Sequence, residues 1–305
     1  MNSKELLDAL LNRLWEAYKE RVSYAQVYNQ MVLERGGHMT NDHMAFRTFN
    51  ADQGQPAGIE ALSRIFKPLG YYKAGEYEFK EKKLYAEHFL HENPLKPKIF
   101  ISQLEVAQLP EASQELINQA IASSKDPLTP QTLKLLETLD IHGAVRADQS
   151  KPLLDNLYAA FARPWEPPLR ESVLTLDKTS QYAAWTLLHG NSVNHFTAYI
   201  NEQNVPEWKG DIEVTMDALR NAGVPIKKDI EGARGTKLRQ SSTAAVVEKC
   251  PVQEKDGSLS EIEWTYAYYE LLERHEVEDA HGNKSLFTGF LGEQATNLFE
   301  MTKKA

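Results

Sequence analysis

Residues 41–49 of the chain read NDHMAFRTF, and residues 193–201 read VNHFTAYIN. Each stretch places an Asp or Asn directly before a His and then alternates apolar residues with others. This alternation is typical of a β-strand that shows different surroundings on its two faces. The two stretches stand about 150 residues apart. One chain therefore contains two similar strands, and each begins with a histidine.

The segments that follow the two strands are also similar. Apolar residues at helical spacing come next in both halves, and a glycine ends each helical pattern. His43 and Gly70 are 27 positions apart, and His195 and Gly223 are 28 apart. The common order predicts an internal duplication. The expected elements are helices at 57–68 and 211–223, a hairpin at 71–92, and strands at 97–106, 236–249 and 261–274.

The residues outside the two repeats predict further helices. Asn2 and Glu5 form a candidate capping box, and helical spacing of apolar residues follows to about Glu34. Residues 107–190 hold four helical patterns separated by prolines, which favours an ordered helical insertion over a disordered linker. We expect a single unit over residues 1–305: N-terminal helices (1–37), a first βαβββ module (38–106), the insertion (107–190), a second βαβββ module (191–288) and a C-terminal tail (289–305).

Composition excludes several classes of partner. The formal net charge is −9, without a Lys/Arg stripe, so nucleic acid and anionic membranes are not expected partners. Cys250 is the one cysteine and cannot form an internal disulfide, which fits a reducing compartment. No signal peptide is visible, and no apolar run approaches the ~20 residues of a membrane span. These features predict a cytoplasmic protein, whereas its oligomeric state is left open.

The two strand histidines suggest a metal site. If the halves pack by pseudo-twofold symmetry, His43 and His195 point into one cavity from neighbouring strands. Two histidines plus one carboxylate are the ligands of non-haem Fe(II) oxygenases. A single histidine on a strand is usually only packed and hydrogen-bonded, so the matched position in both repeats carries the hypothesis. His88 and His91 are rivals, but they lie on opposite faces of one expected strand.

The carboxylate is expected from YYELLERH at 268–275. Glu270 and Glu273 lie on opposite faces of the expected strand. The face of Glu270 is apolar and aromatic, and a carboxylate there is costly to bury without a metal or another cation. The alternative is an ion pair between Glu270 and an arginine. Glu273 has the pattern of an ordinary solvated residue.

Four segments together resemble one known family. They are NDHMAFRTF (41–49), with an Arg four residues after the His, KLRQSST (237–243), YYELLER (268–274) and GFLGEQATNLFEMT (289–302). They resemble the 2-oxoadipate dioxygenase/decarboxylase (hydroxyglutarate synthase) family of the vicinal oxygen chelate superfamily, over most of residues 5–302. That superfamily includes glyoxalase I and extradiol dioxygenases. The resemblance implies an α+β fold in which two βαβββ modules form a half-open barrel.

The resemblance also implies a ligand set and a substrate-binding residue. Fe(II) would be held by His43, His195 and Glu270, and Arg47 would grip a substrate carboxylate. Arg47 lies on the His43 face, ~13 Å along the strand, and its long side chain can reach back. A guanidinium matches a carboxylate with two hydrogen bonds, which Lys cannot do. The alternative is a structural arginine that pairs with an acid.

Two further parts of the family segments are assigned from their position. Gln240 shares a strand face with Leu238 and Ser242, and we expect it to hydrogen-bond the substrate or a metal-bound oxygen. Arg239 is on the other face and could face solvent. The tail either covers the pocket and excludes water or docks as a helix on the core. Its apolar residues are Phe290, Leu291, Leu298 and Phe299.

The expected reaction follows from the resemblance: 2-oxoadipate, or a similar 2-oxo acid, and O2 give 2-hydroxyglutarate and CO2. One alternative is a glyoxalase-like isomerase or hydrolase that uses Zn²⁺ or Ni²⁺. Such a site usually has a second carboxylate ligand, for which Gln103 or Glu105 are candidates. Another alternative is a binding protein of the same fold without chemistry, because a fold does not fix a function.

Overall fold

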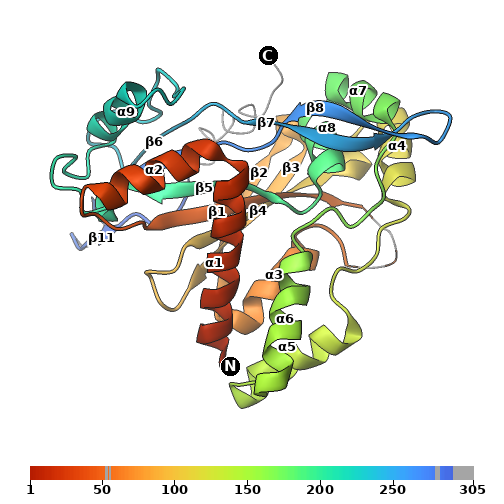
Figure 1. Cartoon of the computed structure of the whole chain (residues 1–305), viewed down its shortest axis with the longest axis horizontal. Helices are drawn as coiled ribbons and strands as arrows, with labels where there is room; N and C mark the ends of the chain where they lie inside the picture. Colours follow the sequence, from red (N-terminus) through yellow and green to blue (C-terminus); the bar gives the residue numbers. More distant parts are fainter. Residues whose placement is uncertain (52–53, 55, 279–281, 291–305) are drawn as a thin grey trace.

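The computed structural model of the chain describes residues 1–51, 54, 56–278 and 282–290. Its centre is one curled sheet of seven strands in the order β2-β3-β4-β1-β5-β9-β6 (Figure 1). The two halves of the sheet meet where β1 pairs with β5. The strands of this sheet are β1 (Asn41–Asn50), β2 (Tyr71–Phe79), β3 (Leu84–His91), β4 (Lys98–Glu105), β5 (Val193–Tyr199), β6 (Leu238–Ser242) and β9 (Glu270–Arg274).

The two halves have the same internal order. In the first, β1 is followed by α3 (Gly58–Phe66) and three strands, the last of which, β4, returns to lie parallel to β1. In the second, β5 is followed by α9 (Ile212–Asn221) and β6, and β9 returns to lie parallel to β5. Because β1 and β5 are antiparallel neighbours, a pseudo-twofold axis relates the halves. The duplicated α+β architecture expected from the sequence is confirmed.

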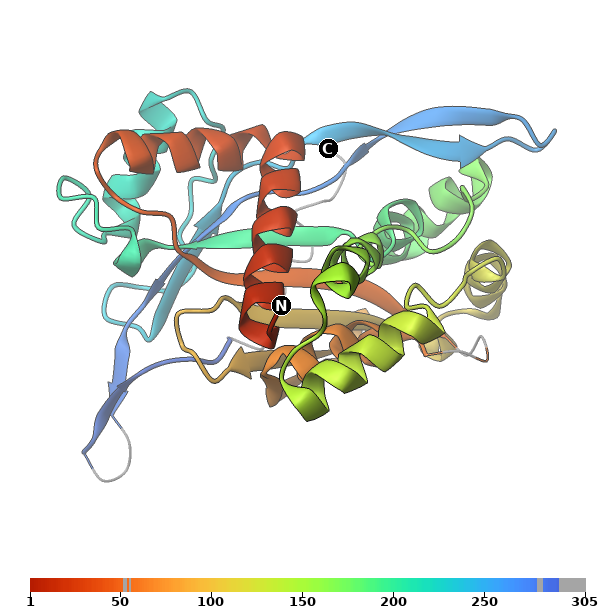
Figure 2. The same ribbon diagram turned by 60° about the horizontal axis from the view of Figure 1, so that its bottom comes forward.

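The second half departs from the sequence-based expectation in its strands. The expected strands at 236–249 and 261–274 are both interrupted, and their outer parts form a separate hairpin of β7 (Val247–Gln253) and β8 (Leu259–Thr265). Figure 2 shows this hairpin projecting beyond the main sheet. Residues 264–269 are buried, so the apolar pattern of the sequence does not show that one strand ends at Thr265 and the next begins at Glu270. The counterpart of β2 is reduced to bridges from Ile226 and Glu231 to the β6 segment.

Helices cover both faces of the sheet, and the alternation along β1 assigns each side chain to one of them. Met44 and Phe46 pack in one apolar cluster with α1, α2, α3, α5, α6 and α9. Ala45 and Phe49 pack in a second cluster with α4, and α7 and α8 contribute residues to both clusters. The N-terminal helices and the helical insertion are therefore confirmed. Their bounds are α1 (Ser3–Arg21), α2 (Ser23–Glu34), α4 (Glu111–Ile121), α5 (Pro130–His142), α6 (Ala147–Ala159), α7 (Arg170–Thr179) and α8 (Gln181–His189).

Smaller features complete the fold. The capping box at the start of α1 is confirmed, since the Asn2 and Glu5 side chains each accept the other's backbone N–H. Two short strands, β10 (Glu276–Glu278) and β11 (Lys284–Leu286), form a hairpin after β9. Within the described residues, none of the helices combines the length and apolar character needed to span a bilayer.

The turn that leads from α8 into β5 depends on Gly190. Its φ is +58°, and an added Cβ would lie 2.4 Å from the Cα of Arg163. The backbone conformation and the close approach therefore both require glycine. Gly143, at the end of α5, is a useful contrast: its φ is +73°, but nothing lies within 4 Å of an added Cβ.

We predict that Gly190→Ala lowers the free energy of unfolding by more than about 3 kcal/mol, because backbone strain and a backbone clash add. Gly143→Ala should cost only about 1 kcal/mol, since it adds strain without a clash. Urea unfolding followed by circular dichroism measures both. Equal losses of stability in the two variants would contradict the packing of Gly190 against Arg163.

Candidate metal centre

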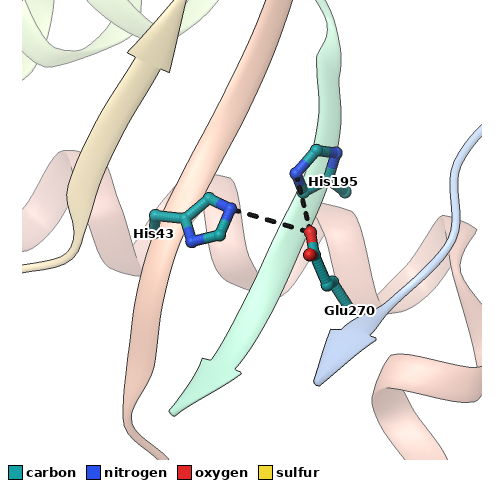
Figure 3. Close-up of side chains that lie close together, drawn as sticks. All are labelled: His43, His195 and Glu270. Atoms are coloured by element: carbon teal, nitrogen blue, oxygen red, sulfur yellow. Dashed lines mark ion pairs between the residues drawn. The ribbon is translucent and has the colours of Figure 1, made fainter. Parts of the chain in front are cut away.

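Three side chains from three neighbouring strands converge on one point: His43 on β1, His195 on β5 and Glu270 on β9 (Figure 3). The His195 Nε2 atom lies 3.1 Å from Glu270 Oε2, and the His43 Nε2 atom lies 3.7 Å from the same oxygen. All three residues are buried. Their ligand atoms lie within 4.8 Å of one another, close enough to bind one metal ion. The structure therefore brings together the three residues singled out from the sequence.

Each histidine follows the extra residue of a β-bulge. Between Asn41 and His43, β1 advances two residues while β5 advances one, so Asp42 is the extra residue. At the pseudo-symmetric place, β5 carries Asn194 as its extra residue, directly before His195. A bulge re-aims a side chain locally, which lets neighbours in sequence reach each other instead of pointing to opposite faces.

The bulged residues orient the two imidazole rings. The Nδ1 atom of His43 lies 2.8 Å from Asp42 Oδ2, and the Nδ1 atom of His195 lies 3.1 Å from Asn194 Oδ1. Because these oxygens accept, each Nδ1 carries the hydrogen, and each Nε2 presents its lone pair to the centre. This arrangement is the usual second contact of metal-binding histidines. It explains why both stretches, at 41–49 and 193–201, place Asp or Asn directly before His. This repeated pair is visible in the sequence, but periodicity alone gives it no function.

Asp42 is itself held by cations. Arg274 donates to its two oxygens, from Nε at 2.6 Å and from a terminal nitrogen at 2.8 Å, and Lys98 Nζ lies 3.1 Å away. Burial alone would raise the pKa of Asp42, but the charges of Arg274 and Lys98 and the hydrogen bonds of Arg274 and His43 hold it well below its ordinary value. The carboxylate therefore stays ionised and fixes the His43 ring.

The environment of Glu270 fits a bound cation. Its Oε1 atom is buried and has no hydrogen-bond partner within the described part of the chain. Burial tends to raise the pKa of Glu270, but with no cation bound its close contact with His195 and the electrostatic effect of both histidines bring it below its ordinary value. Burial lowers the pKa of His195, although Glu270 opposes this, and so favours the neutral imidazole that a metal needs.

Thr197 stands between two of the candidate ligands. Its Oγ1 atom lies 3.0 Å from His43 Nε2 and 3.2 Å from Glu270 Oε2. A hydroxyl has one hydrogen, so it can donate to only one of these atoms at a time. With a cation on His43 Nε2, the hydroxyl is free to donate to Glu270.

The pseudo-twofold axis shows which residue of the first half corresponds to Glu270. Glu270 pairs with Thr197, two residues after His195, and the equivalent residue two after His43 is Ala45. Ala45 pairs with Phe100 on β4. Phe100 therefore stands where a second carboxylate ligand would be, and an apolar ring cannot bind a metal.

The two candidates for such a ligand in the sequence, Gln103 and Glu105, lie elsewhere. Gln103 pairs with Thr48, five residues along β1 from His43, which is ~17 Å away. The side chain of Gln103 accepts from the backbone N–H of Ile59 at the start of α3, and Glu105 lies farther still. The suggestion that Gln103 or Glu105 supplies a ligand is therefore wrong.

Arg47 is buried on the His43 face of β1. Its guanidinium carbon lies 5.1 Å from the ring centroids of both Tyr182 and Trp185 on α8. Its charge is among the causes that lower the pKa of His195, so its field reaches the centre. Burial lowers the pKa of Arg47 itself. The aromatic rings hold a cation within electrostatic reach of the candidate metal site, as its expected role requires.

Gln240 and Glu273 are placed by the pairing of β6 with β9. Gln240 lies on the Glu270 face, is buried, and donates to Glu231 Oε2 at 2.9 Å. Arg239 is on the other face, but it is buried and pairs with Glu273 at 3.2 Å, so the suggestion that it faces solvent is wrong. Glu273 is buried too, not solvated. Among the described residues, the ion-pair partners of Glu270 are the two histidines and not an arginine.

Phe290 covers one side of the centre. Its ring centroid lies 4.8 Å from that of His43, 4.9 Å from that of Phe100 and 5.3 Å from that of His88. Its backbone N–H donates to the Tyr77 hydroxyl at 3.1 Å. The other apolar tail residues singled out from the sequence lie outside the described residues: Leu291, Leu298 and Phe299.

Comparison with known proteins identifies the family. The family model described as 2-oxoadipate dioxygenase/decarboxylase matches residues 6–302, and the chain belongs to this family. A chloroplastic/amyloplastic 2-oxoadipate dioxygenase/decarboxylase of Oryza sativa is 29% identical over 253 residues. The match covers 77% of this chain and 61% of the rice protein, so this chain spans about three fifths of that relative's length.

Two solved structures show the same fold. A protein from Ralstonia eutropha JMP134, assigned to the glyoxalase superfamily, has a TM-score of 0.83 at 24% identity, over 95% of this chain and 87% of that one. The hydroxyglutarate synthase of Oryza sativa, solved in complex with 2-oxoadipate, has a TM-score of 0.73 at 24% identity, over 98% of this chain and 93% of that one.

We predict that Asp42→Asn lowers the free energy of unfolding by about 3–5 kcal/mol at pH 7, because it leaves the buried Arg274 and the half-buried Lys98 beside a neutral group. The folded-state pKa of Asp42 is depressed, so its stabilisation is present above the ordinary value of 3.8 and is lost as the pH falls toward the folded pKa. The difference between wild type and variant should therefore be smaller at pH 3 than at pH 7.

Urea unfolding at both pH values measures this difference. Asp148→Asn is the control, because Asp148 pairs with Arg146 on the surface, and that variant should match the wild type. An Asp42→Asn effect of the same size at pH 3 and pH 7 would contradict the ionised, cation-held Asp42.

Proposed function

We propose that the chain is an Fe(II)-dependent dioxygenase and decarboxylase that converts 2-oxoadipate, or a similar 2-oxo acid, and O2 into 2-hydroxyglutarate and CO2. The observation that carries the proposal is the three-ligand set of His43, His195 and Glu270, with Phe100 at the position of a fourth ligand. Two histidines and one carboxylate that leave open positions are typical of non-haem Fe(II) oxygenases. The names of its relatives support this substrate class.

The reaction balances with one organic substrate. 2-Oxoadipate has six carbons, and loss of C1 as CO2 leaves a five-carbon diacid. One oxygen atom of O2 enters the new carboxylate, and the other enters the new hydroxyl group. When bound, Fe(II) supplies the redox chemistry that activates O2.

The residues of this chain supply the rigidity of the site. Asp42 and Asn194 hold the Nδ1 hydrogens of the two histidines and so fix both rings. Glu270 supplies a negative charge that offsets part of the charge of the cation. Because these groups are fixed before a ligand arrives, little free energy is lost in organising them.

Arg47 is the proposed binding group for a substrate carboxylate. It is a permanent cation, buried beside the rings of Tyr182 and Trp185 and close enough to the candidate centre to lower the pKa of His195. Two parallel hydrogen bonds to a carboxylate would fix the direction of the substrate as well as its place. Gln240 is proposed to hydrogen-bond the substrate from the Glu270 face, oriented by its bond to Glu231.

Phe290 and Phe100 are proposed to keep water from the reacting atoms. Their rings pack against each other, and Phe290 also lies over the His43 ring. An apolar wall at this place strengthens the electrostatic contacts of the bound acid and limits side reactions. Hydrolase or isomerase chemistry of the glyoxalase type has less support, since Phe100 occupies the place of its second carboxylate ligand.

We predict rapid oxygen uptake when the protein, purified without oxygen and loaded with Fe(II), receives 2-oxoadipate. An oxygen electrode measures uptake, and product analysis should find CO2 and 2-hydroxyglutarate in equal amounts. 2-Oxoglutarate and buffer alone serve as controls. Firm iron binding with no uptake would reject the proposed substrate, and uptake without CO2 release would reject the reaction.

Substitutions in the same assay test whether iron binding and turnover depend on the three candidate ligands. His43→Ala, His195→Ala and Glu270→Gln should each lose tightly bound iron and turnover. His142→Ala is the matched control, because His142 lies exposed at the end of α5, and it should behave as wild type. Full activity in any of the first three would overturn the ligand assignment.

We predict that Arg47→Lys keeps bound iron but lowers kcat/KM for 2-oxoadipate by about 100-fold, since an ammonium cannot form the two parallel hydrogen bonds. Steady-state kinetics and iron analysis measure the two effects. Arg146→Lys, on the surface, should change neither. An Arg47→Lys variant with normal kcat/KM would show that Arg47 is structural.

A further inference from the structure

A second group of metal-ligating side chains lies apart from the first. It consists of His189 at the end of α8 and Glu248 and Cys250 on β7. One ligand atom from each lies within 4.8 Å of the others, and His189 and Cys250 are buried. The three side chains line a cavity of about 480 Å³ that neither His43 nor any other residue of the first centre lines.

The contacts of His189 fix which nitrogen can bind a metal. Its Nε2 lies 3.1 Å from the carbonyl oxygen of Thr265. A carbonyl oxygen only accepts, so Nε2 carries a hydrogen and Nδ1 keeps its lone pair in the neutral ring. That Nδ1 atom lies 3.3 Å from Glu248 Oε1. Two acceptors face each other at this distance, and a cation between them would resolve the contact.

The cation between His189 and Glu248 could be a proton or a metal ion, and the position of Cys250 favours a metal ion. A proton between His189 and Glu248 would not engage the nearby sulfur. A metal ion would use all three donors, which are nitrogen, carboxylate oxygen and sulfur. In a tetrahedral zinc site such ligand atoms lie about 3.5 Å apart, so small side-chain rotations would complete the arrangement.

Arg21 holds the carboxylate in place. It donates to both oxygens of Glu248, at 2.6 and 3.2 Å, and its guanidinium carbon lies 3.5 Å from the ring centroid of Tyr266. Arg21 thus restricts Glu248 to the orientation that faces His189. A carboxylate fixed by such an outer contact is typical of metal sites.

We propose that His189 Nδ1, Glu248 and Cys250 Sγ form a second metal site, selective for a thiolate-binding divalent cation such as Zn²⁺, with a fourth position open to the cavity. Sulfur favours Zn²⁺ over the hard cations that oxygen ligands prefer. Binding replaces the thiol hydrogen by the metal, and the proton leaves to solvent. The site is independent of the function proposed for the first centre.

Cobalt titration of the metal-free full-length protein tests this site without any need for turnover. Co²⁺ is the probe, because its bond to a thiolate gives a charge-transfer absorption in the near ultraviolet, and Cys250 is the only cysteine in the chain. We expect this absorption to saturate by two equivalents of Co²⁺, one for each proposed site, and to be abolished by excess Zn²⁺. Wild-type protein without the absorption would overturn the proposal.

Variants assign the signal to the site. Cys250→Ser and His189→Gln should each lose the absorption and one equivalent of bound metal, whereas His43→Ala should keep the absorption. Circular dichroism checks that each variant is folded. If Cys250→Ser does not fold, a measurement on the wild-type protein replaces that variant: bound Zn²⁺ should slow alkylation of the Cys250 thiol. Alkylation at an unchanged rate with Zn²⁺, or absorption retained in folded His189→Gln, would overturn the site.

Discussion

The antiparallel pairing of β1 with β5 is the constraint on which the site depends. It brings together two strands that are distant in sequence and fixes His43 and His195 diagonally on one face. Each strand carries one bulge, directly before its histidine, and the pseudo-twofold axis relates the two bulges. A register slip of one residue between β1 and β5 would send one histidine to the opposite face from the other, because side chains alternate along a strand. The bulges resist such a slip, since each must meet a regular stretch of the partner strand.

The two halves have diverged at the positions that determine the chemistry. Asp42 in one half corresponds to Asn194 in the other, so one imidazole is oriented by a charge and the other by a neutral amide. Glu270 corresponds to Phe100, so only one half supplies a carboxylate. A fully symmetric pair would place two carboxylates around the cation and occupy one more of its positions. In the proposed reaction, this asymmetry would leave room for a chelating acid and O2 beside the three candidate ligands.

Local periodicity in the sequence predicted which face of a strand each side chain occupies. It did not predict the contacts between residues that are distant in the sequence. Alternation correctly separated Glu270 from Glu273, and the matched spacing selected His43 and His195 among nine histidines. The ion pair of Asp42 with Arg274 joins residues 232 positions apart, and no local pattern indicates it. The choice of Gln103 or Glu105 failed because strand register, not residue type, decides which position of β4 faces the centre. The sequence did not predict the interruption between β8 and β9, because residues 266–269, which form it, are as buried and as rich in aromatic residues as a strand.

Arg274 connects Asp42, which orients His43, with the segment that leads to Phe290, and the pairing of β1 with β5 does not position that segment. It lies four residues after Glu270 on β9, binds Asp42 across the sheet, and donates to the backbone carbonyls of Phe287 and Gly289. A buried ion pair gains little net stability, because desolvation of its charges offsets their attraction. Its value here is orientation, since one guanidinium fixes both the carboxylate behind His43 and the backbone that leads to Phe290. The Phe290 ring, which covers the centre, and the His43 ring, a candidate ligand, are therefore both held in place through Arg274.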